Sequence, residues 1–340
     1  MSGKTMEIIC TCGPTVSTPE MVAALIKEGT TVFRINFSHG ARADHMKFAE
    51  TVREGMKLAG KQIKLTGDIQ GPKFRIGMFE GNEIQLAVGS QFILDSDTTI
   101  GNQARVFLPH PEMAEVVEVG DEIILNDGLV VAECIEKIYE SATSFKITTK
   151  CIQSGPISNK KGISIPCRLI KTPFPTEKDK VCIETSNMLG LDHLMLSFVQ
   201  CPQDVLSVRK LMPNAHLMSK IETPVGVHNL AAIAEVSDSI MIARGDLGVE
   251  ARLSRVPMIQ KHMCKQLSGK KAIYCGTQFL ESMVVNAEPT FSEINDIFNA
   301  IHDGVDGILL TGETANGKHP VEAVRWLKNV IDQALAVQNL

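Results

Sequence analysis

The chain repeats one pattern of apolar and polar positions. A short run rich in Val, Ile and Leu is followed by a polar or glycine-containing turn and then by a segment with helical periodicity. Apolar residues within each run are continuous rather than alternating, which indicates strands buried on both faces. Eight runs share this form: EIICTCG (7–13), TVFRINFSHG (31–40), IKLTGDIQG (63–71), HLMLSFV (193–199), HLMSKIE (216–222), SIMIARGD (239–246), AIYCGTQ (272–278) and GILLTGET (307–314). They predict an α/β fold, a (β/α)₈ TIM barrel, with a doubly wound open sheet as the alternative.

The segments between these runs carry helix boundary signals. In TPEMVAALIKEG (18–29), Thr18 is a predicted N-cap, Pro19 takes the first helical position and Gly29 is a predicted C-cap. The segments QDVLSVRKLM and PVEAVRWLKNVIDQAL behave similarly. Each strand is therefore expected to lead into a helix.

One connection is much longer than the others, because the third run ends at residue 71 and the fourth begins at residue 193. Within it the pattern changes to alternating strands separated by Gly, Asn and Asp turns, which predicts a small all-β domain inserted after strand 3. Helical periodicity then resumes, with Thr176 as the expected N-cap. The predicted division is 1–71 for the first part of the barrel, 72–167 for the inserted domain and 168–340 for the second part of the barrel. An insertion at this face is a candidate lid over an active site.

Composition narrows the class of protein. Of the 340 residues, 44% are hydrophobic and 21% are charged, as in globular proteins, and the net charge of −5 argues against a nucleic-acid partner. No apolar run is long enough to span a membrane, and the start has no secretory signal. The nine cysteines are widely spread and odd in number, which is typical of reduced thiols. We therefore expect a cytoplasmic protein.

Candidate chemistry gathers at the carboxyl ends of the predicted strands, where barrels of this type carry their functional side chains. Acidic, basic, hydroxyl and amide side chains, together with one glycine, occur at the ends of several strands. These residues are Arg34, Asn36, Ser38, His39, Asp68, Lys73, Arg75, Lys220, Glu222, Arg244, Gly245, Asp246, Thr277 and Gln278. Glu222 and Asp246 follow adjacent strands and suit a hard divalent cation. Arg34, Arg75 and Lys220 would bind anionic oxygens around this cation. The pattern therefore predicts a phosphorylated, carboxylate-bearing substrate with Mg²⁺.

Several motifs, in order and spacing, resemble those of pyruvate kinases. They are VFRINFSHG, GDIQGPKFRIG, SNKKG, TEKDK, LMSKIETPVG, IMIARGDLGVE, GTQFLESM and TGETANGKHPVEAV. The resemblance implies a barrel carrying a capping β-domain. It further implies a glycolytic kinase that transfers the phosphoryl group of phosphoenolpyruvate to ADP, giving pyruvate and ATP, with Mg²⁺ or alternatively Mn²⁺.

The resemblance also implies roles for residues that match the family motifs. Glu222 and Asp246 match the Mg²⁺ ligands, and Lys220 matches the residue that stabilises charge on the transferring phosphoryl group and the enolate. Arg34 would bind phosphoryl oxygens, while Thr277, with the backbone of Gly245 and Asp246, would hold the carboxylate. Thr277 also matches a residue near the enolate carbon that receives a proton. Candidates for the nucleotide side are Asn36, His39, Arg75 and Lys161.

Many family members need K⁺, held by residues that match Asn36, Ser38 and Asp68. Those members carry an acid where this chain has Lys73, in the sequence DIQGPK. The resemblance therefore points to the potassium-independent branch, in which an ammonium group, protonated at neutral pH, replaces the cation. The alternative is a surface lysine at a hinge.

Three features depart from the family pattern. Most members continue into a C-terminal effector domain, which we expect this chain to lack, and whether residue 340 is a natural end stays open. Gln200 and Cys201 stand where an arginine is usual, and Phe291 replaces the arginine of a P-T-R-A-E motif. Effectors, nucleotide preference and a homo-oligomer are left undecided. The other functions considered are phosphoenolpyruvate-dependent transfer to another acceptor, a non-catalytic phosphoenolpyruvate-binding regulator and an Mg²⁺-dependent barrel aldolase.

Overall fold

The computed structural model describes residues 6–166 and 168–338. Eight parallel strands form a closed barrel: β1 (Glu7–Thr11), β2 (Val32–Asn36), β3 (Lys64–Ile69), β12 (His193–Leu196), β13 (His216–Ile221), β14 (Ser239–Ala243), β15 (Ala272–Gly276) and β16 (Gly307–Leu310). Residues Glu7 and Gly307 pair where the first strand meets the last. The predicted barrel is confirmed, and the open sheet is excluded because such a sheet would leave β1 and β16 unpaired with each other.

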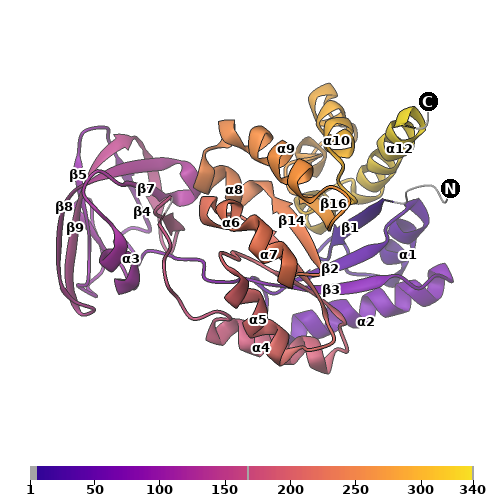
Figure 1. Ribbon diagram of the computed structural model, residues 1–340, viewed down its shortest axis with the longest axis horizontal. Coiled ribbons are helices and arrows are strands. Elements are labelled where there is room, and N and C mark those ends of the chain that lie inside the picture. Colours follow the sequence, from indigo (N-terminus) through magenta and orange to yellow (C-terminus); the bar gives the residue numbers. More distant parts are fainter. Residues whose placement is uncertain (1–5, 167, 339–340) are drawn as a thin grey trace.

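Helices surround the barrel (Figure 1). They are α1 (Pro19–Glu28), α2 (Arg42–Ala59), α4 (Glu177–Met188), α5 (Pro202–Leu211), α6 (Pro224–His228), α7 (Leu230–Val236), α8 (Arg244–Ala251), α9 (Val256–Leu267), α10 (Phe291–Asp303), α11 (Gly312–Ala315) and α12 (Pro320–Gln338). The predicted caps are confirmed: Thr18 accepts a hydrogen bond from the backbone N–H of Met21, and Gly29 ends α1. Thr176 caps α4.

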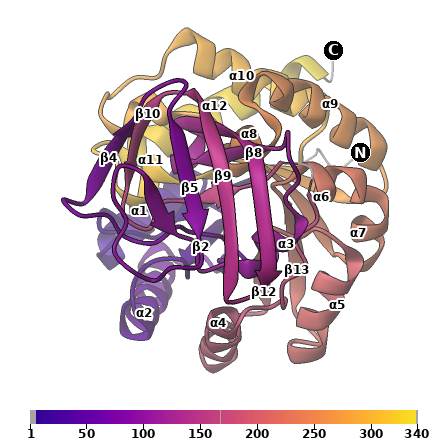
Figure 2. The same cartoon turned by 90° about the vertical axis from the view of Figure 1, so that its left-hand side faces the viewer.

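The inserted segment forms two sheets with a separate apolar core. One sheet pairs β4 (Glu83–Leu86) with β10 (Gly155–Ser158). The other contains β5 (Gln91–Asp95), β6 (Arg105–Phe107), β7 (Glu122–Leu125), β8 (Val130–Ser141), β9 (Ser144–Gln153) and β11 (Ile163–Ser164). Figure 1 places these strands at one end of the molecule, and Figure 2 looks across them onto the barrel. The exact division at 72 and 167 stays a proposal.

One short helix, α3 (Pro111–Val116), was missed by the expectation of an all-β insertion. Pro111 takes the first helical position, and Met113 and Ala114 are buried in the core of the inserted sheets. Six residues give fewer than two turns, which is too short for helical periodicity to be visible in the sequence. The fold class is otherwise as predicted.

Gly71, directly after β3, fixes where the chain leaves the barrel. Its φ of +65° is in the left-handed region, and a Cβ atom there would lie 2.3 Å from the carbonyl oxygen of Ser197. Only glycine permits this close approach. The backbone N–H of Gly71 donates to Oδ1 of the buried Asp179 in α4 at 3.1 Å. The start of the insertion is therefore anchored to the barrel wall.

The amino-terminal end of the barrel lumen is closed by polar side chains. His193 and His216 are paired across β12 and β13, with ring centroids 5.0 Å apart. Glu7, which lines the same cavity as the two histidines, accepts hydrogen bonds from Tyr274 and Lys64. Burial lowers the pKa of both histidines; His216 is lowered further by His193, whereas Asp192 and Asp238 act to raise these pKa values. Both rings are therefore neutral near neutral pH.

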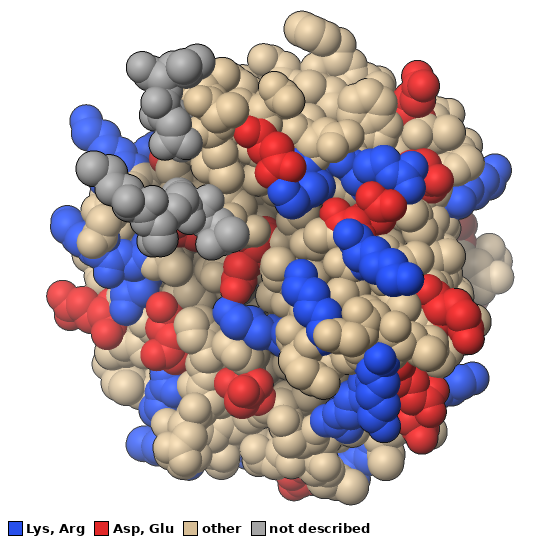
Figure 3. Space-filling model, turned by 90° about the vertical axis from the view of Figure 1, so that its right-hand side faces the viewer, with Lys and Arg blue, Asp and Glu red and all other residues tan. Residues whose placement is uncertain are grey.

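The face opposite the inserted domain carries basic and acidic side chains intermixed (Figure 3). No field of one sign stands out on the described residues visible there. Among the helices of the described ranges, none is both long and apolar enough to cross a membrane.

We expect His193 and His216 to lower the free energy of unfolding as the pH falls below about 6.5, the ordinary pKa of histidine, whereas the raised pKa values of Glu222 and Glu250 act in the opposite direction. The unfolded chain then takes up protons on His193 and His216 before the folded chain does, because their folded-state pKa values are lowered. Urea unfolding at several pH values between about pH 7.5 and pH 5.5 measures how the free energy of unfolding changes with pH. Relative to the native chain, the double variant His193→Gln, His216→Gln should lose less free energy of unfolding as the pH falls over this range. An equal change in the two proteins would contradict the assignment.

Candidate active site

Asp68, at the carboxyl end of β3, is the centre of a buried charge network. Its Oδ2 atom accepts a hydrogen bond from Nε of Arg34 at 2.6 Å and lies 3.2 Å from Nζ of Lys220. All three side chains are buried. Burial alone would raise the pKa of Asp68, but the charges of Lys220 and Arg34 outweigh it and lower that pKa. The carboxylate is therefore ionised and holds both cations in place.

Lys220 projects from β13 between two acids. Its Nζ atom lies 3.3 Å from Oε1 of Glu222 and donates to Oγ of Ser197 at 2.8 Å. Burial acts to lower the pKa of Lys220, but Asp68 and Glu222 raise it above its ordinary value. The site thus contains a fixed, permanently charged ammonium group.

Glu222 is buried and its carboxylate is costly to ionise. Burial raises its pKa to about 7; Lys220 opposes this rise, whereas the charge of Asp246 adds to it. Oε2 of Glu222 accepts a hydrogen bond from the backbone N–H of Phe198 at 2.6 Å. Two acids close enough for the charge of Asp246 to raise the pKa of Glu222 are suited to share a cation.

Glu222 and Asp246 are the residues that could hold a metal ion here. The described residues contain no group of three or more His, Cys, Asp or Glu side chains arranged for a metal. A hard divalent cation, which takes oxygen ligands, fits the pair if substrate and water oxygens complete its coordination. The predicted pairing of these two acids therefore agrees with their donor chemistry.

Thr277 follows β15 and faces the start of α8. The backbone N–H of Gly245 donates to Oγ1 of Thr277 at 2.7 Å. This N–H was expected to bind a substrate carboxylate together with Thr277, but here it is bonded to the threonine itself. The hydroxyl hydrogen of Thr277 remains able to donate elsewhere, because Oγ1 acts as the acceptor in this bond.

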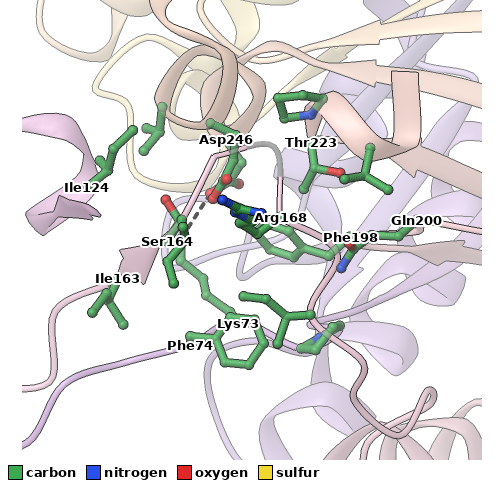
Figure 4. A pocket seen from close by; sticks show the side chains of 18 of the residues that line it. Lys73, Phe74, Ile124, Ile163, Ser164, Arg168, Phe198, Gln200, Thr223 and Asp246 are labelled. Carbon is green, nitrogen blue, oxygen red and sulfur yellow. Dashed lines mark hydrogen bonds and ion pairs between the residues drawn. The ribbon is translucent and has the colours of Figure 1, made fainter. Parts of the chain in front are cut away.

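Lys73 makes its ion pairs with acids other than Asp68, the acid of its predicted group. Its Nζ atom is 2.9 Å from Oδ1 of Asp246 (Figure 4). The same atom is 3.7 Å from Oδ1 of Asp127, which belongs to the inserted domain. The expected grouping of Lys73 with Asn36, Ser38 and Asp68 is corrected accordingly, since the oxygens of Asp68 are engaged by Arg34, Lys220 and Ser197. Sequence spacing alone did not show that the chain turns toward α8 after Gly71.

A different ammonium group reaches the loop after β2. Lys178, on α4, donates to the carbonyl oxygen of Ser38 at 3.0 Å and to Oε1 of Gln70 at 2.6 Å. Strand-end reasoning missed it because it lies on a helix, although the motif TEKDK contains it. Ser197 and Thr11 were also missed, and both lie at strand ends where the same reasoning could have found them.

The four residues predicted for a nucleotide lie at the rim of this network. Oδ1 of Asn36 accepts from the backbone N–H of Ser38 at 3.1 Å, and His39 is exposed. Arg75 donates to the carbonyl oxygen of Lys160 at 2.9 Å, next to Lys161 at the base of the inserted domain. Asn36 and His39 lie at the end of β2 and just after it, whereas Arg75 follows β3 and Lys161 lies between β10 and β11.

A cavity lies between the start of the inserted segment and α8. Phe74, Ile124 and Phe198 contribute apolar walls, and Lys73 and Asp246 contribute charge (Figure 4). Glu250 lines it as well, and burial raises the pKa of this acid to about 7. The charged residues of the site therefore extend to the contact between the barrel and the inserted domain.

This arrangement is matched by proteins of one family. The family model for the barrel domain of pyruvate kinase matches residues 3–324. The pyruvate kinase of Methylorubrum extorquens is 40% identical over 332 residues, which are 96% of this chain and 68% of that protein. That of Bacillus licheniformis is 39% identical over 334 residues, or 96% of this chain and 57% of that protein.

Comparison with a solved structure also indicates the pyruvate kinase family. The crystal structure of a pyruvate kinase from Cryptosporidium parvum matches with a TM-score of 0.91 and 32% identity, covering 97% of this chain and 69% of that one. This chain therefore spans between just over half and about two thirds of the length of these relatives. The resemblance found in the motifs is confirmed, and the chain belongs to the pyruvate kinase family.

Proposed function

We propose that this chain transfers the phosphoryl group of phosphoenolpyruvate to ADP, giving pyruvate and ATP. The observation that carries the proposal is the buried set of Arg34, Lys220 and Glu222 at one end of the barrel, next to Asp246. Transfer of a phosphoryl group requires positioning and electrostatic stabilisation more than covalent chemistry. A rigid cluster of cations beside two acids is suited to that task.

Glu222 and Asp246 would hold Mg²⁺, with Mn²⁺ as an alternative. The ion would neutralise charge on phosphoryl and carboxylate oxygens of the substrate. The two carboxylates fit this role because the charge of Asp246 raises the pKa of Glu222, and a shared cation would offset that repulsion. Mg²⁺ is usually bound through one or two carboxylates and substrate oxygens.

Lys220 and Arg34 would bind the transferring group. Arg34 is held by Asp68 and by Thr11, whose Oγ1 accepts from the guanidinium at 3.0 Å, so its remaining N–H groups have a set direction. Lys220 would stabilise charge on the phosphoryl group and on the enolate left behind. Both cations are fixed before substrate arrives, which reduces reorganisation during the reaction.

Thr277 would bind the substrate carboxylate and lie near the enolate carbon that is protonated. Because Gly245 donates to Oγ1 of Thr277, we propose that the hydroxyl O–H of Thr277 and the backbone N–H of Asp246 donate to the carboxylate. In this arrangement the backbone N–H of Gly245 orients Thr277. The same N–H would bind substrate directly only if its hydrogen bond to Thr277 were broken.

The nucleotide side would be formed by Asn36, His39, Arg75 and Lys161, at the rim between barrel and inserted domain. Lys178 joins this set because its ammonium group, which projects from α4, donates to the carbonyl oxygen of Ser38 in the loop after β2. Basic groups on both sides of the cleft are suited to a diphosphate. The inserted domain would close over the bound nucleotide as a lid.

We further propose that K⁺ is not required. Lys73 supplies a fixed positive charge in the cleft, where Asp246 and Asp127 hold it and raise its pKa despite the lowering effect of burial. The charge therefore lies beside the proposed metal ligand rather than beside Asp68.

A homo-oligomer also remains a proposal, supported by Phe291, whose side chain is 87% exposed at the start of α10.

The first experiment measures pyruvate formation from phosphoenolpyruvate and ADP with Mg²⁺, with and without K⁺. We expect activity that K⁺ does not change in the native protein, and a K⁺ requirement or loss of activity in Lys73→Glu. Lys171→Glu, an exposed lysine on the other connection to the inserted domain, is the control. Activity that depends on K⁺ in the native chain would exclude the role of Lys73 but keep the enzyme. Phosphoenolpyruvate binding without turnover would favour another acceptor or a binding protein.

Lys220→Met should reduce turnover by about a hundredfold or more, the effect of removing one preorganised charge from such a site. The fold should persist because Arg34 still neutralises Asp68. Steady-state kinetics and circular dichroism test this, with Lys210→Met on the exposed side of α5 as the matched control. A turnover number close to that of the control would remove Lys220 from the mechanism.

Glu222→Gln should weaken Mn²⁺ binding by at least about tenfold, as expected when a metal site loses a charged group. Titration calorimetry or the paramagnetic signal of free Mn²⁺ measures this in the absence of substrates. Glu235→Gln, on the exposed face of α7, is the control for the loss of one negative charge. Equal Mn²⁺ affinity in the two variants would exclude Glu222 as a ligand.

A further inference from the structure

The turn that carries Thr277 has an unusual backbone. Thr277 has a φ of +71° and Gln278 a φ of +57°, so two successive residues with Cβ atoms are in the left-handed region. Single non-glycine residues in this region are uncommon, and a pair persists only when surrounding contacts hold it. Something in the structure must therefore stabilise this turn.

The guanidinium group of Arg244 makes these contacts. Its terminal NH2 atom donates to the carbonyl oxygens of Thr277 and Gln278, each at 2.9 Å, and its Nε atom lies 3.2 Å from the carbonyl oxygen of Thr277. Both peptide carbonyls of the strained turn are thus bound by one side chain. A planar group with several N–H donors in fixed directions can do this, whereas a single ammonium group cannot reproduce the geometry.

Arg244 is itself held rigidly. It is 6% exposed, its NH1 atom lies 2.8 Å from Oδ2 of Asp296 in α10, and its guanidinium carbon stands 3.8 Å from the ring centroid of Phe279. An ion pair and an aromatic face therefore fix the plane of the group. Arg244 therefore connects α10 to the turn after β15.

The next residue completes the arrangement. Gly245 donates its backbone N–H to Oγ1 of Thr277 at 2.7 Å, so two consecutive residues hold the backbone and the side chain of Thr277. A Cβ atom on Gly245 would lie 3.2 Å from that same Oγ1 atom. The start of α8 thus aligns the threonine with Asp246, one residue further on.

We propose that Arg244 is a positioning residue that, through the backbone of Thr277 and Gln278, sets the direction of the Thr277 hydroxyl in the active site. The proposal rests on the function assigned above to Thr277. Arg244 makes no contact with substrate in this scheme and acts only through the turn.

The first test compares Arg244→Lys with the native chain in steady-state kinetics. We expect kcat to fall by about 10- to 100-fold, the loss that follows a small misplacement of a catalytic group, with a smaller change in KM for ADP. Arg209→Lys is the matched control, because Arg209 also bridges an aspartate, Asp238, and a backbone carbonyl, that of Ala215. The control should retain native kcat, and equal kcat in both variants would overturn the proposal.

Coupling to Thr277 separates positioning from a general effect on the fold. If Arg244 acts through Thr277, then Arg244→Lys should lower kcat far less when Thr277→Val is already present. The combination of Arg209→Lys with Thr277→Val should be additive. An additive result for Arg244 as well would refute action through the threonine.

Chemical rescue supplies a second readout. A cleft of about 230 Å³ between α9 and α10 is lined by Arg244 and Asp296, and it gives a small cation a route to the turn. Methylguanidinium at non-denaturing concentration should restore part of the kcat of Arg244→Ala, but not that of Thr277→Val. If Arg244→Ala does not fold, Asp296→Asn removes the anchor alone and should lower kcat in the same direction.

A spectroscopic test does not depend on turnover. In protein labelled at threonine methyl groups, the signal of Thr277, assigned by its loss in Thr277→Val, should shift in Arg244→Lys and stay unchanged in Arg209→Lys. A native protein without pyruvate-forming activity would refute the proposed function, while the methyl shift would still decide whether Arg244 positions the threonine. An unchanged methyl signal would overturn the inference regardless of activity.

Discussion

The pairing of Asp68 with Arg34 and Lys220 is the interaction on which the site depends. Burying three charges costs several kcal/mol for each ion in desolvation, so the cluster is tolerated only if each charge meets its partners in good geometry. Parallel strands provide that geometry, because β2 and β3 pair in a register that sets Asn36 opposite Asp68. The barrel therefore determines the directions of the cations, and local flexibility contributes little.

The contact between the inserted domain and the barrel has a different character. It includes the ion pairs of Lys73 with Asp246 and of Glu122 with Arg252, whose side chains are all partly exposed. Partly exposed pairs of this kind contribute little to stability. The domain is therefore anchored firmly at Gly71 but held more weakly over the cleft. This combination supports the role of a lid proposed above for the inserted domain.

Much of the fold could be predicted because it depends on short-range signals. Continuous apolar runs identified the eight barrel strands, and Thr18, Gly29 and Thr176 marked helix ends through local hydrogen bonds. The short helix α3 was missed because six residues carry too little periodicity. Residues at strand ends, such as Asp68 and Lys220, were found because every parallel strand of a barrel delivers its carboxyl end to the same face.

The sequence by itself determined the fold class, the family motifs and the identities of the charged residues in the site. Only the tertiary structure decided their partners. Lys73 pairs with Asp246 instead of Asp68, and Gly245 binds Thr277 through its backbone. Arg244 binds two carbonyl groups 33 and 34 positions away in the chain. These contacts depend on how a loop turns after its strand and on backbone atoms common to every residue type, so neither leaves a pattern in the order of side chains.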